Sequence, residues 1–289
     1  MGSEAPDAFK PAPTTIAQAL QQAHAAGVDR FDAQLIVCTV LGVSRSWVLA
    51  HDRDPLPPAQ LPRLLDWLRR RACGEPFAYL QGEKEFFGLA LRVTPDTLIP
   101  RPDTETLVHW ALELLPAEAA RRVADLGTGS GAIALAIASQ RPLTQVTAVD
   151  FSAGALAVAL GNAEHHRLPN VQGLQGSWFD PLQGQRFDLI ASNPPYIAEG
   201  DHHLNALQHE PITALTAGPD GLDDLRHIVA HAPAHLHPGG WLLLEHGHDQ
   251  ASEVQHLLLN HGFTDVETRR DLGGNARCTG GRCANPTTG

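Results

Sequence analysis

Hydrophobic residues in the first part of the chain recur at every third or fourth position, which is the spacing of one face of a helix. The spacing holds over residues 14–28, 31–43 and 61–74. Thr14 or Thr15 can cap the first of these helices, because a side-chain oxygen there can accept a hydrogen bond from the first turn. Residues 1–80 are therefore predicted to form a small helical bundle.

A different pattern begins after this bundle. Residues 84–93 contain short aromatic and branched runs on either side of Gly88, which predicts a β-hairpin. We expect residues 81–100 to link the bundle to a second domain over residues 101–289. Pro102 then stands where a new helix would begin.

From about residue 120 the chain alternates between short apolar strands and helices. Strands are predicted at 121–127, 144–150, 170–176, 187–193, 240–247 and 263–271, with helices at 131–140, 152–166, 222–236 and 251–262. This alternation predicts an α/β fold with a doubly wound sheet and helices on both faces. In such sheets the ligand binds outside the carboxyl ends of the strands, so residues at those ends matter most.

Composition limits what such a protein can do. The 289 residues are 43% hydrophobic and 18% charged, which is typical of a folded chain with a sizeable core. Lys and Arg number 21 against 32 Asp and Glu, a formal net charge of -11, and Lys10 and Lys84 are the only lysines. A broad grip on nucleic-acid phosphates is therefore disfavoured, although a local patch of arginines leaves that class of substrate open.

The cysteines and the apolar runs indicate a reduced, intracellular protein. Free thiols are expected at Cys38, Cys73, Cys278 and Cys283. Neither these cysteines nor the paired histidines have companions at metal-binding spacing. No signal peptide is recognised, and the longest apolar run, at 132–138, is too short to span a bilayer. We expect a cytoplasmic protein without a bound metal or a membrane partner.

The first predicted strand of the second domain runs into Gly127-Thr128-Gly129-Ser130-Gly131 and then directly into a helix. Glycines here let the backbone turn tightly and let a ligand approach without a Cβ in the way. The G-x-G-x-G spacing differs from the G-x-G-x-x-G of dinucleotide-binding turns. A tight turn without a ligand is the alternative interpretation.

Asp150 ends the next strand, where a carboxylate can accept hydrogen bonds from ribose hydroxyls. It could equally cap the helix that follows. Taken with the glycine loop, it indicates a nucleoside-binding half of the sheet. A nicotinamide cofactor and S-adenosylmethionine both fit this pattern. The shorter glycine spacing favours S-adenosylmethionine, because that ligand has no pyrophosphate.

The most informative motif is Asn193-Pro194-Pro195-Tyr196, at the end of a predicted strand. Consecutive prolines stiffen the chain, so the Asn193 side chain and the Pro194 carbonyl can be held pointing into the strand-end crevice. Both groups accept hydrogen bonds from an incoming NH2 group, and Tyr196 offers an aromatic wall for a planar amide or base. A purely structural Pro-Pro turn would explain the shape but not the flanking Asn193 and Tyr196.

With this motif the chain resembles the class I, Rossmann-like methyltransferases that use S-adenosylmethionine to modify planar NH2 groups. It is more closely similar to the release-factor glutamine methyltransferase family, and the similarity covers nearly the whole chain. The matching segments, in order, are 75–93, 97–108, 123–136, 187–198 and 239–247. Residues 99–105, Ile-Pro-Arg-Pro-Asp-Thr-Glu, are the most specific of them. Amino-methyltransferases that act on DNA share the Asn-Pro-Pro-Tyr motif but generally lack this segment.

The resemblance implies a cofactor, S-adenosylmethionine, and a set of residues that bind it. The loop from Gly127 to Gly131 and the Asp150 carboxylate would hold its methionine part and its ribose, and Trp178 would pack near its adenine. Asn193 would touch both the cofactor and the substrate. From the residues alone, a core role for Trp178 is equally compatible with its place after a strand.

The resemblance also implies the substrate, which is the glutamine of a Gly-Gly-Gln loop in peptide-chain release factors. Asn193, Pro194, Pro195 and Tyr196 would bind the glutamine amide, with Asn193, Pro194 and Tyr196 as the catalytic residues. Hydrogen bonds from the amide to Asn193 and to the Pro194 carbonyl would favour a pyramidal nitrogen and aim its lone pair at the methyl group. No nucleophilic residue, metal or strong base is then required.

Three functions are compared: glutamine methylation of release factors, methylation of an exocyclic amine in DNA or RNA, and nucleoside binding without catalysis. The charge of -11 disfavours the second, and the glycine loop, Asp150 and the Asn-Pro-Pro-Tyr motif together disfavour the third. We expect the first, in a monomer that makes no direct contact with nucleic acid. Residues 1–80 would then recognise the partner protein.

Overall fold

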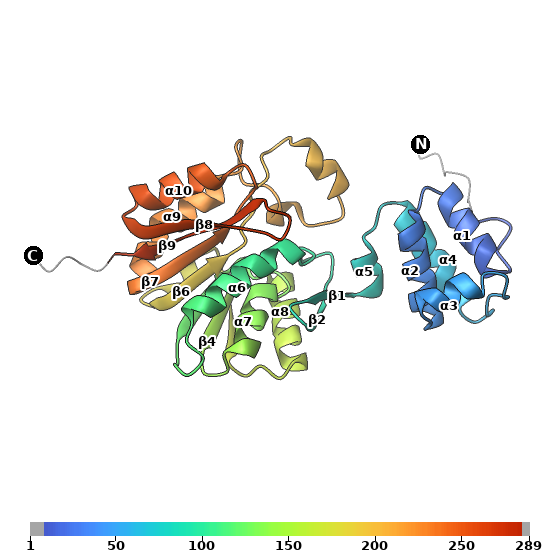
Figure 1. The fold of residues 1–289 in the computed structure, drawn as a ribbon, viewed down its shortest axis with the longest axis horizontal. Helices are drawn as coiled ribbons and strands as arrows, with labels where there is room; N and C mark the ends of the chain where they lie inside the picture. Colours follow the sequence, from blue (N-terminus) through green and yellow to red (C-terminus); the bar gives the residue numbers. More distant parts are fainter. Residues whose placement is uncertain (1–8, 285–289) are drawn as a thin grey trace, which may run out of the picture. The chain divides into compact units, whose positions relative to one another are not determined.

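The computed structural model describes residues 9–284, and the chain divides after Gly82 into two compact units (Figure 1). The first unit consists of helices. Their bounds are α1 Ile16–Ala25, α2 Arg30–Leu41, α3 Arg45–Ala50, α4 Leu61–Ala72 and α5 Phe77–Gln81. The helical bundle predicted for the first part of the chain is therefore confirmed.

The helices of the first unit begin at side-chain caps and pack on an apolar core. The Thr15 side chain accepts a hydrogen bond from the Gln18 backbone N–H at the start of α1, and Asp29 caps α2 in the same way. Ile36, Leu64 and Leu68 are fully buried in this core. Each such side chain contributes about 2 kcal/mol through its removal from water.

The second unit is built on a seven-stranded sheet in the order β5-β4-β3-β6-β7-β9-β8. The strands are β3 Arg122–Leu126, β4 Gln145–Asp150, β5 Val171–Gln175, β6 Phe187–Ser192, β7 Leu236–Glu245, β8 Phe263–Arg270 and β9 Ala276–Cys283. Strands β3 to β7 run parallel, and β9 runs antiparallel to both of its neighbours. The predicted doubly wound α/β sheet is confirmed.

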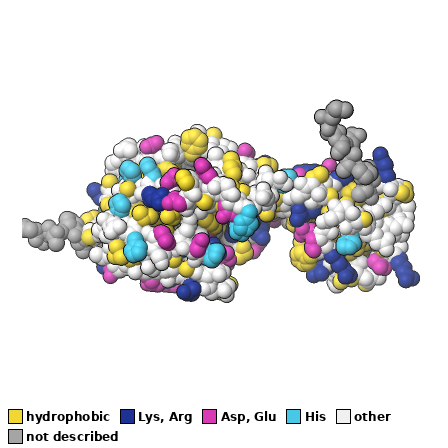
Figure 2. All heavy atoms as spheres, turned by 90° about the horizontal axis from the view of Figure 1, so that it is seen from above, with side chains coloured by type: hydrophobic (Ala, Val, Ile, Leu, Met, Phe, Trp, Pro, Cys, Tyr) yellow, Lys and Arg dark blue, Asp and Glu magenta, His cyan; other side chains and the backbone are white. Residues whose placement is uncertain are grey.

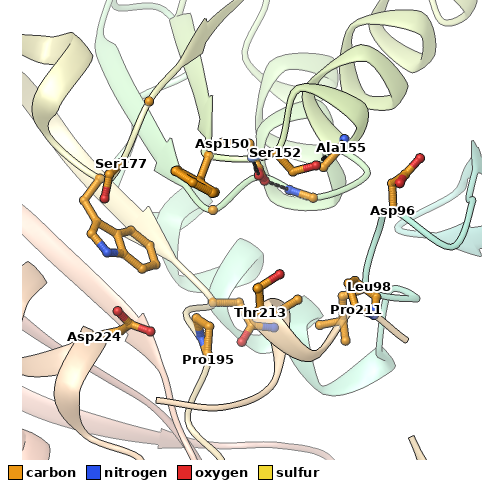
Figure 3. A pocket seen from close by; sticks show the side chains of 17 residues that line it. Asp96, Leu98, Asp150, Ser152, Ala155, Ser177, Pro195, Pro211, Thr213 and Asp224 are labelled. Atoms are coloured by element: carbon orange, nitrogen blue, oxygen red, sulfur yellow. Dashed lines mark hydrogen bonds between the residues drawn. The ribbon is translucent and has the colours of Figure 1, made fainter. Parts of the chain in front are cut away.

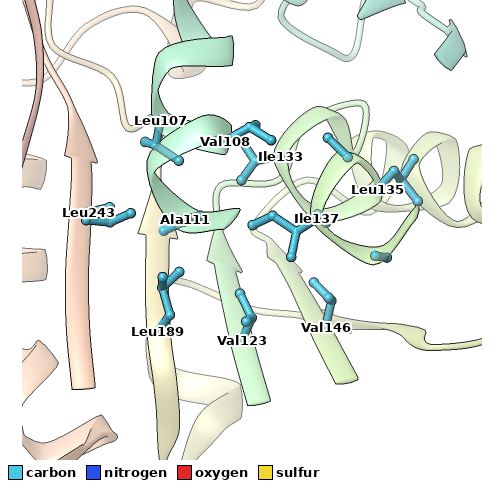
Figure 4. Packing of buried hydrophobic residues seen from close by; sticks show 14 of the residues in the cluster. Leu107, Val108, Ala111, Val123, Ile133, Leu135, Ile137, Val146, Leu189 and Leu243 are labelled. Atoms are coloured by element: carbon cyan, nitrogen blue, oxygen red, sulfur yellow. The ribbon is translucent and has the colours of Figure 1, made fainter. Parts of the chain in front are cut away.

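Helices cover both faces of this sheet, as predicted (Figure 1). Those longer than one turn are α6 Glu105–Leu114, α7 Ala132–Gln140, α8 Ala153–His165, α9 Asp223–His235 and α10 Ala251–Asn260. Val123 and Leu189 point into the core under α6 and α7 (Figure 4), whereas Leu126 and Ile190 point into the core under α9 and α10. Side chains of a strand alternate between its faces, so the strands between the two layers are apolar on both.

The predicted hairpin is formed by β1 Glu83–Phe86 and β2 Leu89–Arg92, with Gly88 in the turn at a φ of 78°. Phe86 and Leu91 are buried in the same core as α6 and α7. Asn162 of α8 also binds the backbone of Arg92, donating to its carbonyl at 3.0 Å and accepting from its N–H at 2.9 Å. The hairpin therefore packs as part of the second unit.

Strand β9 was not predicted, because its sequence has no run of alternating apolar residues. Its central residues include Gly280, which packs where no side chain fits. A Cβ there would lie 2.5 Å from Cδ2 of Leu243 and 2.8 Å from Trp110. The strand is specified by this close approach and by its pairing with β7 and β8, neither of which is visible in the sequence pattern.

The predicted free thiols are found at Cys38, Cys73, Cys278 and Cys283. Cys278 is buried in β9, and burial raises the pKa of its thiol. No helix within residues 9–284 is long and apolar enough to cross a bilayer.

Candidate active site

Four strands end at one edge of the sheet, and the predicted site residues follow them. A cavity of about 240 Å³ lies at this edge (Figure 3). The predicted residues that line it are Gly127, Gly129, Asp150, Trp178, Asn193 and Pro195. Thr128, Ser130, Gly131, Pro194 and Tyr196 are not among the lining residues, although each stands within two positions in sequence of one that is.

The glycine loop leaves β3 and enters α7 with Gly127, Gly129 and Gly131 at φ values of 71°, 57° and 87°. These are left-handed conformations, which residues with a Cβ rarely adopt. A Cβ on Gly127 would also lie 3.4 Å from the Trp178 ring. The side chains between the glycines, Thr128 and Ser130, are buried and point away from the cavity wall.

Asp125, the penultimate residue of β3, binds both the glycine loop and the start of α7. Its Oδ2 accepts hydrogen bonds from the Thr128 hydroxyl at 2.6 Å and from the Ala134 N–H at 3.1 Å. Burial raises the pKa of this carboxyl to about 7. Its Oδ1 is buried and accepts no hydrogen bond from any described residue. Its sequence context gave no signal for this role, since Asp125 stands near the end of a predicted strand.

Asp150 ties the glycine loop to the end of β4. Its Oδ2 accepts from the Gly129 N–H and its Oδ1 from the Ser152 N–H, both at 2.8 Å. Burial raises the pKa of the carboxyl. The interpretation of Asp150 as a helix cap is wrong, because the cap of α8 is Ser152, whose hydroxyl accepts from the Ala155 N–H. Asp150 faces the cavity, along one side with Ser152 (Figure 3).

Trp178 forms a wall of the cavity and has an unusual backbone, with a φ of 45°. Its indole N–H donates a hydrogen bond to Asp224 in the first turn of α9. Asp224 also lines the cavity (Figure 3), and partial burial raises the pKa of its carboxyl. Asp224 was not recognisable as a site residue from the sequence, because acidic residues are common in the first turn of a helix without any ligand.

The Asn-Pro-Pro-Tyr motif follows β6 and is held at both ends. Ser192, just before it, donates its hydroxyl proton to the Leu126 carbonyl at 2.7 Å. The Tyr196 carbonyl accepts from the Gln250 side chain at 3.0 Å. Burial raises the pKa of the Tyr196 phenol above its ordinary value. Asn193 and Pro195 both line the cavity, and Pro195 lies across it from Asp150 (Figure 3).

The segment 99–105 lies beside this motif. Arg101 pairs with Glu210, a buried carboxylate that also accepts the Ile99 N–H at 3.0 Å. Asp103 pairs with Arg277 of β9 at 3.2 Å. These contacts join the segment to β9 and to the loop before η4 Ile212–Ala214, whose Thr213 and Ala214 line the cavity. The sequence indicated that the segment was specific without indicating these partners.

Several cavity residues could not be recognised in the sequence. They are Asp96, Leu98, Phe151, Ser152, Ala155, Gly176, Ser177, Pro211, Thr213, Ala214 and Asp224. Phe151 is 76% exposed and follows Asp150 directly. Its position just after a predicted strand was the one sequence feature that could have marked it as a site residue. Most of the others come from loops that fold back over the strand ends.

Comparisons with known proteins agree with this geometry. Two family models match, "PrmC N-terminal domain" at residues 14–82 and "Methyltransferase small domain" at 104–216. The release factor glutamine methyltransferase of Salmonella typhimurium is 49% identical over 92% of this chain and 96% of its own length. That of Bordetella pertussis is 51% identical over 88% and 95%, respectively. A methyltransferase structure from Pyrococcus furiosus shares the fold, with a TM-score of 0.53 and 19% identity over 76% of this chain and 98% of that one. The chain belongs to the release factor glutamine methyltransferase family.

Proposed function

We propose that this chain transfers a methyl group from S-adenosylmethionine to the side-chain amide nitrogen of the glutamine in the Gly-Gly-Gln motif of peptide-chain release factors. The observation that carries this proposal is the placement of Asn193, which lines the same cavity as Gly127, Gly129 and Asp150. This placement supports a cofactor site next to an acceptor for an NH2 group. The names of the 49% and 51% identical relatives support the choice of substrate.

The residues at the cavity fit S-adenosylmethionine. Gly127 and Gly129 leave space that a Cβ would fill, and Asp150 provides acceptors for ribose hydroxyls, because each carboxylate oxygen can accept more than one hydrogen bond. Trp178 provides an apolar wall for the adenine. When bound, the cofactor supplies an electrophilic methyl group.

The chain's own contribution to the reaction is to orient the amide of the substrate. The Asn193 oxygen and the Pro194 carbonyl accept the two amide hydrogens, which draws the nitrogen lone pair out of conjugation and directs it at the methyl group. Pro194 and Pro195 restrict the backbone, so these acceptors do not reorganise during the reaction. The proton is lost to solvent after methyl transfer, so no buried base is needed at this point.

We further propose that the first unit recognises the release factor. Gln34 is the one polar side chain that is buried among the described residues of this unit. The described part of the unit therefore lacks the cluster of buried polar groups found around the cavity of the second unit, and a role in surface recognition is proposed for it. The proposed reaction belongs to translation, and a cytoplasmic, monomeric enzyme is part of the proposal. No direct contact with nucleic acid is included.

Methylation of an exocyclic amine in DNA or RNA is the second candidate, because the Asn-Pro-Pro-Tyr motif suits any planar NH2 group. The net charge of -11 counts against it. On the face seen in Figure 2, Lys and Arg side chains of the second unit are scattered among Asp, Glu and His rather than gathered into a patch. A nucleic acid would need such a patch for its phosphates.

The test uses S-adenosylmethionine with a labelled methyl group and three acceptors in separate reactions. These are a purified release factor, the same factor with the Gly-Gly-Gln glutamine changed to alanine, and duplex DNA. Label in the intact factor alone is the expected result. Label in DNA would support the second candidate, and label in both forms of the factor would place the modified residue elsewhere.

A further inference from the structure

Three polar side chains from separate segments meet behind the cavity. Thr104 belongs to the segment 99–105, Asn193 follows β6, and Glu245 ends β7. The Asn193 Nδ2 donates to Thr104 Oγ1 at 3.3 Å. Both side chains lie beside the Glu245 carboxylate and lower its pKa, and Glu245 Oε2 is buried without a hydrogen-bond partner among the described residues. Thr104 is 4% exposed and Glu245 1%, and neither lines the cavity.

We propose that Thr104 and Glu245 are positioning residues that fix the side-chain amide of Asn193 with its oxygen toward the cavity. The inference rests on the proposed function, in which that oxygen accepts a hydrogen from the substrate amide. An amide group has a donor end and an acceptor end of nearly the same shape, so only its partners decide which end faces the substrate.

The partners of Asn193 decide this because they accept its hydrogens. The Thr104 hydroxyl accepts from the NH2 end of the Asn193 amide, and the Glu245 carboxylate lies beside that end with its Oε2 unpartnered among the described residues. An ionised carboxylate accepts hydrogen bonds and cannot donate, so both neighbours favour the NH2 group at this end. Reversing the amide would place the Asn193 oxygen against the Glu245 carboxylate, in a buried region where such repulsion is strong. Reversal would also present two donors to a substrate that itself brings donors.

The surroundings of Glu245 disfavour its ionised form, which predominates only above about pH 7. Burial raises the pKa of this carboxyl to about 7, and Asp103 on η1 Pro102–Thr104 adds to the rise, whereas Arg277 of β9 opposes it. Tyr196 and Cys278 also face the group. When protonated, Glu245 gains a donor and no longer forbids the reversed amide. The orientation of Asn193 should therefore be strictest above neutral pH.

This role also accounts for the segment 99–105. Arg101 is held by Glu210 and Asp103 by Arg277, so the segment that carries Thr104 is anchored at two points just before it. Its hydroxyl thereby meets the Asn193 amide across 89 residues of sequence. An NH2-methylating site without this segment would need another group to orient its asparagine.

The kinetic test compares Thr104→Val, which removes the hydroxyl at nearly constant shape, with Thr104→Ser, which keeps it. Methylation of the release factor is followed at saturating S-adenosylmethionine. Thr104→Val should lower kcat by about tenfold to a hundredfold with little change in KM, and Thr104→Ser should restore it. Thr144→Val is the matched control, because the Thr144 hydroxyl is buried without a hydrogen-bond partner among the described residues. An unchanged kcat in Thr104→Val, or equal losses in the Val and Ser variants, would overturn the proposal.

A second readout does not depend on activity. In protein labelled with 15N at asparagine side chains, the NH2 resonances of Asn193 are assigned by their loss in Asn193→Ala. They should shift in Thr104→Val and in Glu245→Gln and stay in place in Thr104→Ser and Thr144→Val. Resonances that are the same in all of these variants would refute the network. If the variants show these shifts but the wild-type enzyme leaves release factors unmethylated, the proposed substrate is refuted and the hydrogen-bond network is kept.

Discussion

The two units of this chain bury different kinds of side chain. Gln34 is the one polar residue buried among the described residues of the first unit, whereas the second buries carboxylates, amides and histidines, including Asp125, Asn162, Glu245 and His246. Buried carboxylates lose hydration, and the pKa values of Asp125 and Glu245 rise to about 7 as a result. The second unit thus carries its chemistry at a cost in stability, and the first unit bears no such cost.

Replacement of Asn193 should give the largest effect on activity. We expect Asn193→Ala to lower kcat by about 100- to 1000-fold, as for loss of a group that stabilises a transition state. The free energy of unfolding should fall by only about 1–3 kcal/mol, the cost of leaving the buried Thr104 hydroxyl without this partner. Methyl transfer and urea unfolding measure the two quantities. The control is Asn205→Ala at an exposed position, and a loss of stability that accounts for the loss of activity would contradict the assignment.

The separation of the two cores can be tested through Leu64, which is fully buried in the first unit. Leu64→Ala should destabilise that unit by about 2–5 kcal/mol. Binding of S-adenosylmethionine should stay unchanged, because the site residues belong to the other unit. Hydrogen exchange and calorimetric titration of the full chain report these effects, with Leu49→Ala at a 53% exposed position as the control. Weaker cofactor binding in Leu64→Ala would mean that the cores are coupled.

The dependence of stability on pH should distinguish the two interiors. Burial raises the pKa of Glu245 from 4.5 to about 7, so between these values the folded protein keeps a proton that the unfolded chain has released. The free energy of unfolding of the second unit therefore falls as pH rises through this window. Glu245→Gln should make the slope shallower, while Asp125 retains its own part of it. Urea unfolding at a series of pH values measures the slope, and an identical slope in the variant would exclude Glu245 as its source.

The smallest expected effect concerns Trp178. Trp178→Phe keeps an aromatic wall but removes the indole N–H that binds Asp224. We expect the dissociation constant for S-adenosylmethionine to rise by about fivefold, which corresponds to the loss of one hydrogen bond of about 1 kcal/mol. Calorimetric titration checks this value. Trp47→Phe in the first unit is the matched control, and a loss of binding beyond a hundredfold would indicate that Trp178 does more than form a wall.

Local patterns were sufficient for most of the fold and for the motifs of the site. The parallel strands and their helices followed from apolar periodicity, because each element must bury one face or both. The glycine loop, Asp150 and Asn193 were recognisable because they stand at strand ends, where a parallel sheet binds ligands. Strand β9 was not recognisable, since Gly280 is required by the neighbouring Trp110 and Leu243 rather than by its own sequence context.

The sequence by itself determined the order of helices and strands and the residue types at each strand end. Those properties depend on the spacing of apolar side chains and on the chemistry of single residues. Only the tertiary structure decided that Trp178 meets Asp224 and that Thr104 and Glu245 meet Asn193. Such contacts join residues far apart in the chain, and they form because parallel strands bring all their carboxyl ends to one edge of the sheet.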